Sequence, residues 1–264
     1  MADNDALPDK ISINLFKSLL ERYDTLITSI SSTKVPNKPG QKTLLELDDF
    51  RYKTAVDAFQ SDSPKRSMTH DDVKALVDWK LRHGKFRPAL MKLVSSNESK
   101  TVDETIQKAM AHYWKTRQIA QAVDTICKLK GIGPATASLL LSVHDPDRVI
   151  FFSDEAFWWL CCGGQKAPIK YNAKEYQQLI QAAGNIAKRL HVSATAVEKA
   201  AYVLLKNGLP ENATAGESLA AESKKEEKSA SSERAIPRKP AKRKEISPPE
   251  VKDNVRRSKR GKAS

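Results

Sequence analysis

The sequence predicts an all-α domain followed by a basic tail, and three observations support this prediction. Apolar residues recur at helical spacing nearly throughout residues 1–210, and no long segment alternates apolar and polar residues as a half-buried strand does. Beyond residue 210, large apolar side chains become rare, and Ala, Ser, Glu, Lys and Pro dominate. Such a composition buries too little apolar surface to offset the entropy of ordering, so residues 211–264 are expected to be disordered.

The first half of the chain contains a series of helical patterns. A first helix is expected where six apolar residues share one face: Ile11, Leu15, Leu19, Tyr23, Leu26 and Ile30. A second pattern spans Leu44–Phe59. Thr69 and Asp72 have the spacing of a capping box, which predicts the start of a helix that continues through Trp79. Shorter patterns follow at Pro88–Val94 and Thr101–Tyr113.

The second half of the domain continues in the same way. Helices are expected at Lys115–Leu129, Pro134–His144, Ala173–Leu190 and Ser193–Leu205. The one segment with an extended pattern, Arg148–Phe152, is short. Residues 1–210 are therefore expected to form one multi-helix domain, and residues 211–264 a separate tail.

The chain is strongly basic, with a formal net charge of +13. Residues 211–264 carry 15 Lys and Arg against 9 Asp and Glu, a net charge of +6, which leaves +7 for residues 1–210. Because the domain is basic in its own right, we expect a polyanionic partner, either nucleic acid or an acidic membrane surface. No apolar run approaches the roughly 20 residues that span a bilayer, which favours nucleic acid over a membrane.

The cysteines form neither a metal-ligand pattern nor a disulfide framework. Three are present, Cys127, Cys161 and Cys162, without a CxxC pair. This number and spacing favour a reducing compartment and exclude an iron–sulfur cluster held by four cysteines of this chain. We therefore expect no metal and no cofactor. The acidic residues 1–10 lack the apolar run of a secretory signal.

The most informative segment is Ile126–Ala137, which reads ICKLKGIGPATA. Gly131 and Gly133 flank one apolar residue between two helical patterns, and both are expected to adopt backbone angles that other residues resist. Pro134 suits the first turn of the second helix, where its missing N–H costs nothing. Such a turn directs the N–H groups of a helix start toward an anion, and a phosphate is well matched to them.

Two interpretations of this segment are open. Gly-x-Gly alone is also typical of an ordinary turn between two helices. The full pattern, with Ile126 and Leu129 before the glycines and Ala137 four residues after the second, resembles the helix-hairpin-helix consensus of DNA-binding proteins. The resemblance favours binding of this segment to the DNA backbone. The candidate DNA contacts are Lys128, Lys130, Gly131, Ile132, Gly133 and Thr136.

An aspartate follows at a spacing that allows it to return to the hairpin. A helix over Pro134–His144 rises about 16 Å, and the segment from Asp145 to Ser153 can span roughly 30 Å when extended. Asp154 would then begin the next helix, close to the start of the previous one.

A helix-hairpin-helix, a proline-containing loop and an aspartate at a helix start resemble the helix-hairpin-helix DNA glycosylase superfamily, with its endonuclease-III-like fold. The resemblance covers about residues 118–160. It implies a glycosylase-like all-α domain in which Asp154 is the catalytic residue. In that family the aspartate stabilises the sugar cation left by a departing base, or activates the attacking water. The hairpin holds the phosphates while the nucleotide turns out of the stack.

Three features depart from that family. Members with lyase activity carry a lysine two residues after the second hairpin glycine, which forms a Schiff base with the sugar. Here that position is Ala135, so lyase activity through that lysine is not expected. The iron–sulfur cluster of some relatives is absent, and Val149–Ser153 replaces a Gly/Pro-rich segment. Three functions remain open: a monofunctional base-excision glycosylase, an inactive protein of this fold that binds DNA or chromatin, and a helical scaffold whose hairpin does not meet DNA.

Other residues also have two interpretations. Asp154 is a favourable helix N-cap as well as a catalytic candidate. Of Trp158 and Trp159, we expect one in the core and one lining a groove, although either suits stacking on an extruded base. His144 suits a general base, but we expect a structural role. A basic cluster either contacts phosphates or forms a solvated helix end: Lys80, Arg82, His83, Lys85 and Arg87.

Two basic clusters in the tail, Pro237–Lys244 and Arg256–Lys262, resemble a nuclear import signal. We therefore expect a location in the nucleus and an import receptor as a partner of the tail. Nonspecific DNA binding and a solubilising role are the alternatives.

Overall fold

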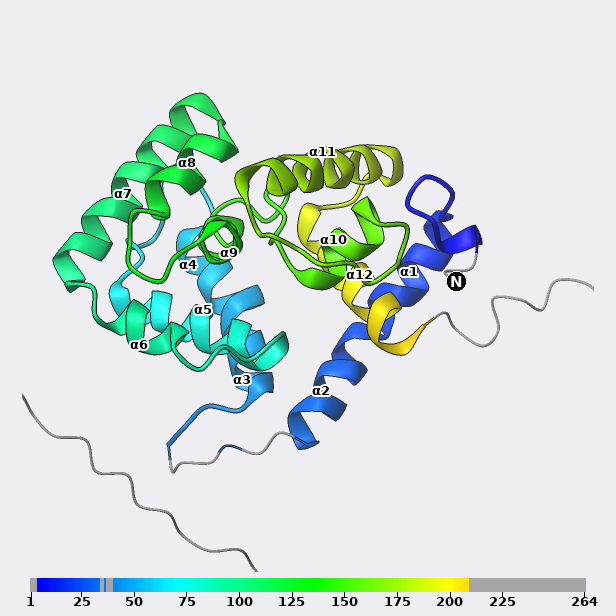
Figure 1. The fold of residues 1–264 in the computed structure, drawn as a ribbon, viewed down its shortest axis with the longest axis horizontal. Helices are drawn as coiled ribbons and strands as arrows, with labels where there is room; N and C mark the ends of the chain where they lie inside the picture. The colour runs from blue at the N-terminus through cyan, green and yellow to red at the C-terminus, as the bar shows by residue number, and fades with distance from the viewer. Residues whose placement is uncertain (1–3, 34–35, 37–39, 209–264) are drawn as a thin grey trace, which may run out of the picture. The chain divides into compact units, whose positions relative to one another are not determined.

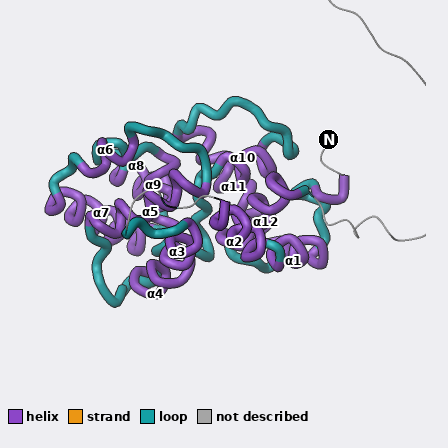
Figure 2. Tube along the Cα trace, turned by 90° about the horizontal axis from the view of Figure 1, so that it is seen from below, coloured by secondary structure: helices purple, strands orange, loops and turns teal. Residues whose placement is uncertain are grey.

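The computed structural model describes residues 4–33, 36 and 40–208, and every regular element within them is a helix (Figures 1 and 2). The all-α prediction is confirmed for this part of the chain. All of these residues belong to one structural unit. The expected tail at residues 211–264 lies outside the described residues. None of the described helices is long and apolar enough to cross a membrane.

The helices form two groups that lie side by side (Figure 1). The terminal group combines helices from both ends of the domain: α1 (Ile13–Glu21), α2 (Tyr23–Thr33), α10 (Asp154–Cys161), α11 (Ala173–Leu190) and α12 (Ala194–Asn207). A short helix η1 (Asn4–Ala6) precedes it. The central group contains the rest: α3 (Leu44–Asp49), η2 (Phe50–Thr54), α4 (Ala55–Phe59), α5 (His70–His83), α6 (Leu90–Ser95), α7 (Ser99–Thr116), α8 (Ile119–Ile126) and α9 (Pro134–Ser142).

The single helix expected across residues 11–30 is wrong, because the chain forms two helices there. α1 ends at Glu21, and Arg22 is its C-cap before α2 begins at Tyr23. The Arg22 guanidinium donates a hydrogen bond of 3.1 Å to the carbonyl oxygen of Gly208, which ties the break to the end of α12. Four of the six residues of the expected apolar face are buried, and the other two, Leu15 and Ile30, are partly buried against the core. The periodicity missed the change in helix direction and the buried Phe16 and Ile27.

The helix expected over residues 44–59 contains a π-helical turn. α3 passes into η2 and then α4, and the wider turn of η2 carries Arg51 into the interior. The capping box at Thr69 and Asp72 is confirmed. A second capping box at Thr43 and Glu46 starts α3. Between α7 and α8 the chain turns at Arg117, which adopts a left-handed φ of 57°.

α9 is enclosed on every side. All its residues from Ala135 to Ser142 are buried, as expected of a helix that is apolar around its whole circumference. The two polar side chains are satisfied locally, because the hydroxyl of Ser138 donates to the carbonyl of Ala135 and that of Ser142 to the carbonyl of Leu139. α9 packs against α5, α8 and α11 and so contacts both groups.

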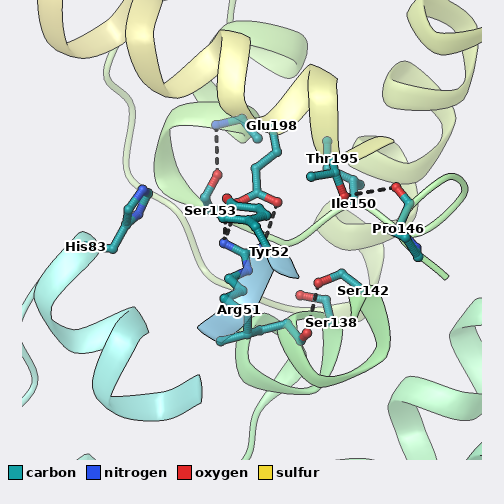
Figure 3. A network of polar contacts seen from close by, with 12 residues as sticks. Arg51, Tyr52, His83, Ser138, Ser142, Pro146, Ile150, Ser153, Thr195 and Glu198 are labelled. Carbon is teal, nitrogen blue, oxygen red and sulfur yellow. Dashed lines mark hydrogen bonds and ion pairs between the residues drawn. The ribbon is translucent and has the colours of Figure 1, made fainter. Parts of the chain in front are cut away.

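A buried ion pair joins the two groups (Figure 3). Arg51 of η2 donates two hydrogen bonds of 2.7 Å to the carboxylate of Glu198 on α12, and both side chains are only 2% exposed. The hydroxyl of Tyr52 donates to the same carboxylate at 3.0 Å. The Arg51 guanidinium lies 3.8 Å from the ring centroid of Trp79 on α5. These contacts satisfy both charges, which compensates for their removal from water.

We predict that Arg51→Met destabilises the domain by about 3–5 kcal/mol, because it leaves the Glu198 carboxylate buried without its partner. The double variant Arg51→Met/Glu198→Leu should recover a large part of that loss, because no charge then remains buried. Urea denaturation measures both values. A single variant as stable as the wild type would contradict the assigned role of the pair.

His144 follows α9 and is a structural residue, as expected. Its side chain is buried, its Nδ1 lies 2.9 Å from the Leu140 carbonyl oxygen, and its ring stacks on Phe59 with centroids 5.4 Å apart. Burial lowers the pKa of His144 to about 4. The residue is therefore neutral at pH 7, and its imidazole has no access to a ligand.

The buried His144 predicts acid sensitivity between pH 6.5 and pH 4. Its pKa is lower in the folded chain than in the unfolded chain, so the unfolded state binds more protons in this window and stability falls as the pH falls. The loss should reach about 3 kcal/mol by pH 4. Urea denaturation of the wild type and His144→Phe at pH 7 and pH 4 measures it. Equal losses in both proteins would show that another group is responsible.

Candidate functional site

The connection between α8 and α9 is held by a glycine and an asparagine. Gly131 has a positive φ of 77°, and a Cβ atom there would lie 2.8 Å from the Cβ of Leu93. Asn97 binds both backbone groups of Lys130: its Oδ1 accepts from the N–H at 2.8 Å, and its Nδ2 donates to the carbonyl at 2.9 Å. The glycine at position 131 is therefore required by the fold, as expected.

The fold does not require a glycine at position 133. Its φ is −100°, an angle that other residues adopt readily, so the expectation that both glycines need special backbone angles is wrong for Gly133. It is the N-cap of α9 and is exposed, and a Cβ atom there would meet nothing within 4 Å. Within the described residues, nothing in the fold excludes a side chain at this position.

The candidate contacts of the hairpin separate into exposed and buried residues. Lys128, Lys130 and Gly133 are exposed, and Gly131 is half-buried. Ile132 and Thr136 are only 5% and 4% exposed. The side chain of Ile132 anchors the turn in the core, so only its backbone is placed to meet a ligand. Thr136 lies beside a cavity described below.

The segment before Asp154 packs along α9. Residues 149–152 form no strand and are buried, and the backbone N–H of Phe152 donates to Oγ of Ser138 on α9 at 2.9 Å. The carbonyl of Ile150 accepts from the hydroxyl of Tyr176 on α11 at 3.0 Å. The apolar composition of this segment is explained by its burial, and the two hydrogen bonds fix the position of the aspartate that follows.

Asp154 is the first residue of α10, as expected, but it does not cap the helix. Ser153 is the N-cap, and its side chain accepts from the N–H of Ala156 at 3.1 Å. The interpretation of Asp154 as a plain N-cap is therefore wrong. Its carboxylate instead accepts a hydrogen bond of 2.6 Å from the hydroxyl of Tyr171. A carboxylate at the start of a helix is also stabilised by the helix dipole.

Tyr171 is held in an uncommon conformation beside the carboxylate. Its φ is 54°, in the left-handed region that residues with a side chain adopt rarely. Burial raises the pKa of Tyr171, and so does its hydrogen bond to Asp154. The phenol therefore stays protonated at neutral pH and acts as the hydrogen-bond donor. The guanidinium of Arg87 lies 5.1 Å from the centroid of the Tyr171 ring.

Two cavities lie on either side of Lys80 and Arg87. The first has a volume of about 270 Å³ and is lined by Asp154, Phe151, Phe152 and Trp158 together with cationic residues of α5, the following loop and α12. The second has a volume of about 230 Å³ and lies at the hairpin, against Gly131, Gly133, Pro134, Ala135, Thr136 and Tyr171. Lys80 and Arg87 line both cavities, so the cavity at Asp154 and the cavity at the α8–α9 connection are neighbours.

The first cavity carries excess positive charge. Five Lys and Arg side chains line it against two carboxylates: Lys80, Lys85, Arg87, Lys166 and Lys206 against Asp154 and Glu155. Glu155 is buried and pairs with Lys206 at 3.0 Å. The remaining cations outnumber Asp154, so the cavity suits a ligand with negative charge.

Lys80 lines both cavities. It is half-buried in the last turn of α5, and its Nζ lies 5.4 Å from the centroid of the Phe151 ring. Burial and the positive charge of Arg87 together lower the pKa of Lys80 to about 8, whereas the charge of Asp154 acts in the opposite direction. A fraction of this amine is therefore uncharged near neutral pH.

The other candidates divide between core and surface. Trp159 is buried and donates to the carbonyl of Ala6, whereas Trp158 is half-buried and lines the first cavity, as expected. Within the basic cluster, Arg82 binds Asp78 and His83 is buried beneath the cavity. Lys85 and Arg87 flank Phe86 in the chain, and the side chain of Phe86 is 68% exposed. Sequence analysis did not single out Phe86, although an aromatic residue between Lys85 and Arg87 is a detectable signal.

The described cysteines and carboxylates provide no metal site. No group of three or more His, Cys, Asp or Glu in the described ranges is arranged to hold a metal ion. Burial raises the pKa of Cys127 and of Cys161 to about 11, so both are protonated thiols at neutral pH.

The arrangement combines a carboxylate, a protonated phenol and a half-buried amine between aromatic walls, next to the exposed start of an enclosed helix. It can place negative charge near one reacting atom while cations hold neighbouring anionic groups. No known family model, curated protein or solved structure matches this chain.

Proposed function

We propose that the chain is a nuclear DNA-binding protein of the helix-hairpin-helix glycosylase type, which excises a base at Asp154. One observation carries this proposal: the α8–α9 connection and Asp154 line neighbouring cavities that share Lys80 and Arg87. The two features were expected from separate parts of the sequence, and a backbone grip beside a carboxylate is the arrangement that excision of a turned-out base requires.

The hairpin is proposed to bind a phosphate of the DNA backbone. The first turn of any α-helix leaves N–H groups without an intrahelical acceptor, and α9 presents its first turn beside the exposed Gly133. Because nothing within 4 Å would meet a Cβ at Gly133, a phosphate oxygen can approach the backbone closely there. Lys128 and Lys130 are exposed near the same turn and add positive charge.

The first cavity is proposed to receive the extruded nucleotide. Its volume of about 270 Å³ is near the lower end of small-molecule sites, about 300 Å³, which suits a single base. The half-buried Trp158 and the wall at Phe151 provide aromatic surfaces for stacking. In this arrangement Asp154 stabilises the positive charge that develops on the sugar as the base departs.

The two hairpin glycines should respond differently to substitution. Gly131→Ala should destabilise the domain by roughly 1–3 kcal/mol, because it strains a positive φ and crowds Leu93. Gly133→Ser should leave stability within about 0.5 kcal/mol, because serine is a favourable N-cap. It should nevertheless lower DNA affinity about tenfold, because its hydroxyl competes for the N–H groups and fills the space of the phosphate.

Fluorescence anisotropy with a duplex that contains a tetrahydrofuran abasic analogue, across salt concentrations, measures this affinity, and thermal unfolding measures stability. Unchanged affinity of Gly133→Ser, with an unchanged salt dependence, would show that the hairpin does not contact the DNA backbone.

Asp154→Asn should lower the rate of base release at least about 100-fold, because the amide keeps a hydrogen-bond acceptor for Tyr171 but lacks the charge. DNA affinity should change by less than about threefold, because the hairpin remains intact. Base release is measured on a panel of duplexes with deaminated, oxidised or alkylated bases. If the wild type binds DNA and releases no base from any of them, the protein is instead a binding module of this fold.

A further inference from the structure

The side chains that line the first cavity mainly donate hydrogen bonds. Among the described residues of its wall, five are Lys or Arg, which in their charged form donate and cannot accept: Lys80, Lys85, Arg87, Lys166 and Lys206. Buried polar groups need hydrogen-bond partners, so a ligand that fills this cavity must offer acceptors to these donors. The excess of donors therefore restricts the chemistry of the ligand.

The acceptors of the same wall are already engaged. Each of the four described lining side chains with an acceptor atom contacts another group: Asp154 accepts from Tyr171, Glu155 pairs with Lys206, Ser153 accepts from the N–H of Ala156, and Nε2 of His83 lies 3.4 Å from the hydroxyl of Tyr23. A donor group on a ligand would have to displace one of these contacts. An acceptor group meets no such competition.

Two of the cations lie over the aromatic walls. Nζ of Lys80 lies 5.4 Å from the centroid of the Phe151 ring, and Nζ of Lys166 lies 6.0 Å from that of Trp158. The face of an aromatic ring attracts positive charge, and here the cations of the protein already supply it. A positively charged base would therefore be repelled from both walls, whereas a base with electronegative oxygens is attracted.

Lys80 is the cation best placed to contact the base itself. It is half-buried, whereas Lys85, Arg87 and Lys166 are exposed and suit the flanking phosphates. At neutral pH most of the Lys80 amine is charged, because the pH lies below its pKa of about 8. Its ammonium group is then a donor only.

A carbonyl oxygen in place of an amino group is the feature that such a donor distinguishes. Adenine carries an amino donor beside the N7 acceptor, whereas a purine with an oxygen at the same position presents two adjacent acceptors, which lysine binds well. Deamination makes this exchange in adenine and in cytosine. It also leaves the base mispaired, and a mispaired base leaves the stack at the lowest cost.

We propose that the first cavity selects deaminated bases, and that Lys80 donates a hydrogen bond to the carbonyl oxygen that has replaced the amino group. This inference rests on the proposed function, since the base reaches the cavity by extrusion from DNA. An amino group at the same position would set donor against donor and leave both unpaired. Cationic alkylated bases are rejected by the charges of Lys80 and Lys166.

The affinities of the full chain for three duplexes test this proposal. Each duplex carries one 2′-fluoroarabino nucleotide opposite guanine, with hypoxanthine, adenine or 7-methylguanine as its base. The fluorine slows loss of the base, so binding is measured without release, and all three bases are mispaired. Fluorescence anisotropy should show that the wild type binds the hypoxanthine duplex at least about tenfold more tightly than the other two. Equal affinities for the three duplexes would overturn the proposal.

The role of Lys80 is tested by the ratio of these affinities in three variants. Lys80→Met should bring the three affinities within about threefold of one another, because methionine has no donor. Lys80→Arg should keep the preference for hypoxanthine, because arginine also only donates. The control Lys74→Met should keep it as well, since Lys74 pairs with Asp71 and lines neither cavity. A full preference in Lys80→Met would show that another group recognises the base.

The tetrahydrofuran duplex separates this inference from the proposed function, because it has no base at the site. If the wild type binds it and does not distinguish the three bases, the selection of deaminated bases fails and the proposed function stands. If the tetrahydrofuran duplex does not bind, the proposed function fails. Calorimetry with inosine 5′-monophosphate and adenosine 5′-monophosphate then decides whether the cavity prefers a carbonyl group, and equal affinities would overturn the inference as well.

Discussion

The buried ion pair between Arg51 and Glu198 determines how the two helix groups meet, and the cavities depend on that arrangement. Charges removed from water are tolerated only while they remain paired and hydrogen-bonded, so the two helices that carry them have little freedom to shift. Arg51 also lies against Trp79, the residue before Lys80 on α5. On the other side, α12 packs against α10, which begins at Asp154. This contact therefore helps to fix the position of α5, which carries Lys80, relative to α10, which begins at Asp154.

Helical periodicity was sufficient to predict the fold class, because most helices bury one face and leave the other in solvent. It was insufficient where the chain changes direction without changing the apolar spacing, as at Arg22, since spacing records which residues are buried and not the direction of the axis. The π-helical turn Phe50–Thr54 was missed for a related reason. One π-helical turn moves the following apolar residues around the helix axis only slightly. That displacement is smaller than the ordinary irregularity of apolar positions in a helix, so it leaves no clear signal in the sequence.

The glycine-containing turn between α8 and α9 and the position of Asp154 at the start of α10 could be predicted from the sequence, because each belongs to a local pattern. Lys80 and Tyr171 could not be assigned to the same site, because they come from distant segments that only packing brings together. The two glycines look alike in the sequence, but their environments differ. Gly131 must be a glycine because of its positive φ and its close neighbours, whereas a Cβ at Gly133 would meet nothing within 4 Å. Which requirement applies to a glycine depends on atoms far along the chain.

The enclosure of α9 has a consequence for the kinetics of recognition. Its start cannot tilt or unwind without repacking a close-packed interior on several sides, so in the proposed function it would meet DNA as a preorganised receptor. The partner would then lose most of the conformational entropy on association. Any change of shape that the complex requires would also occur in the partner. Partners that already bend or open easily should therefore associate fastest, and a selectivity based on flexibility would arise before any chemical group is recognised.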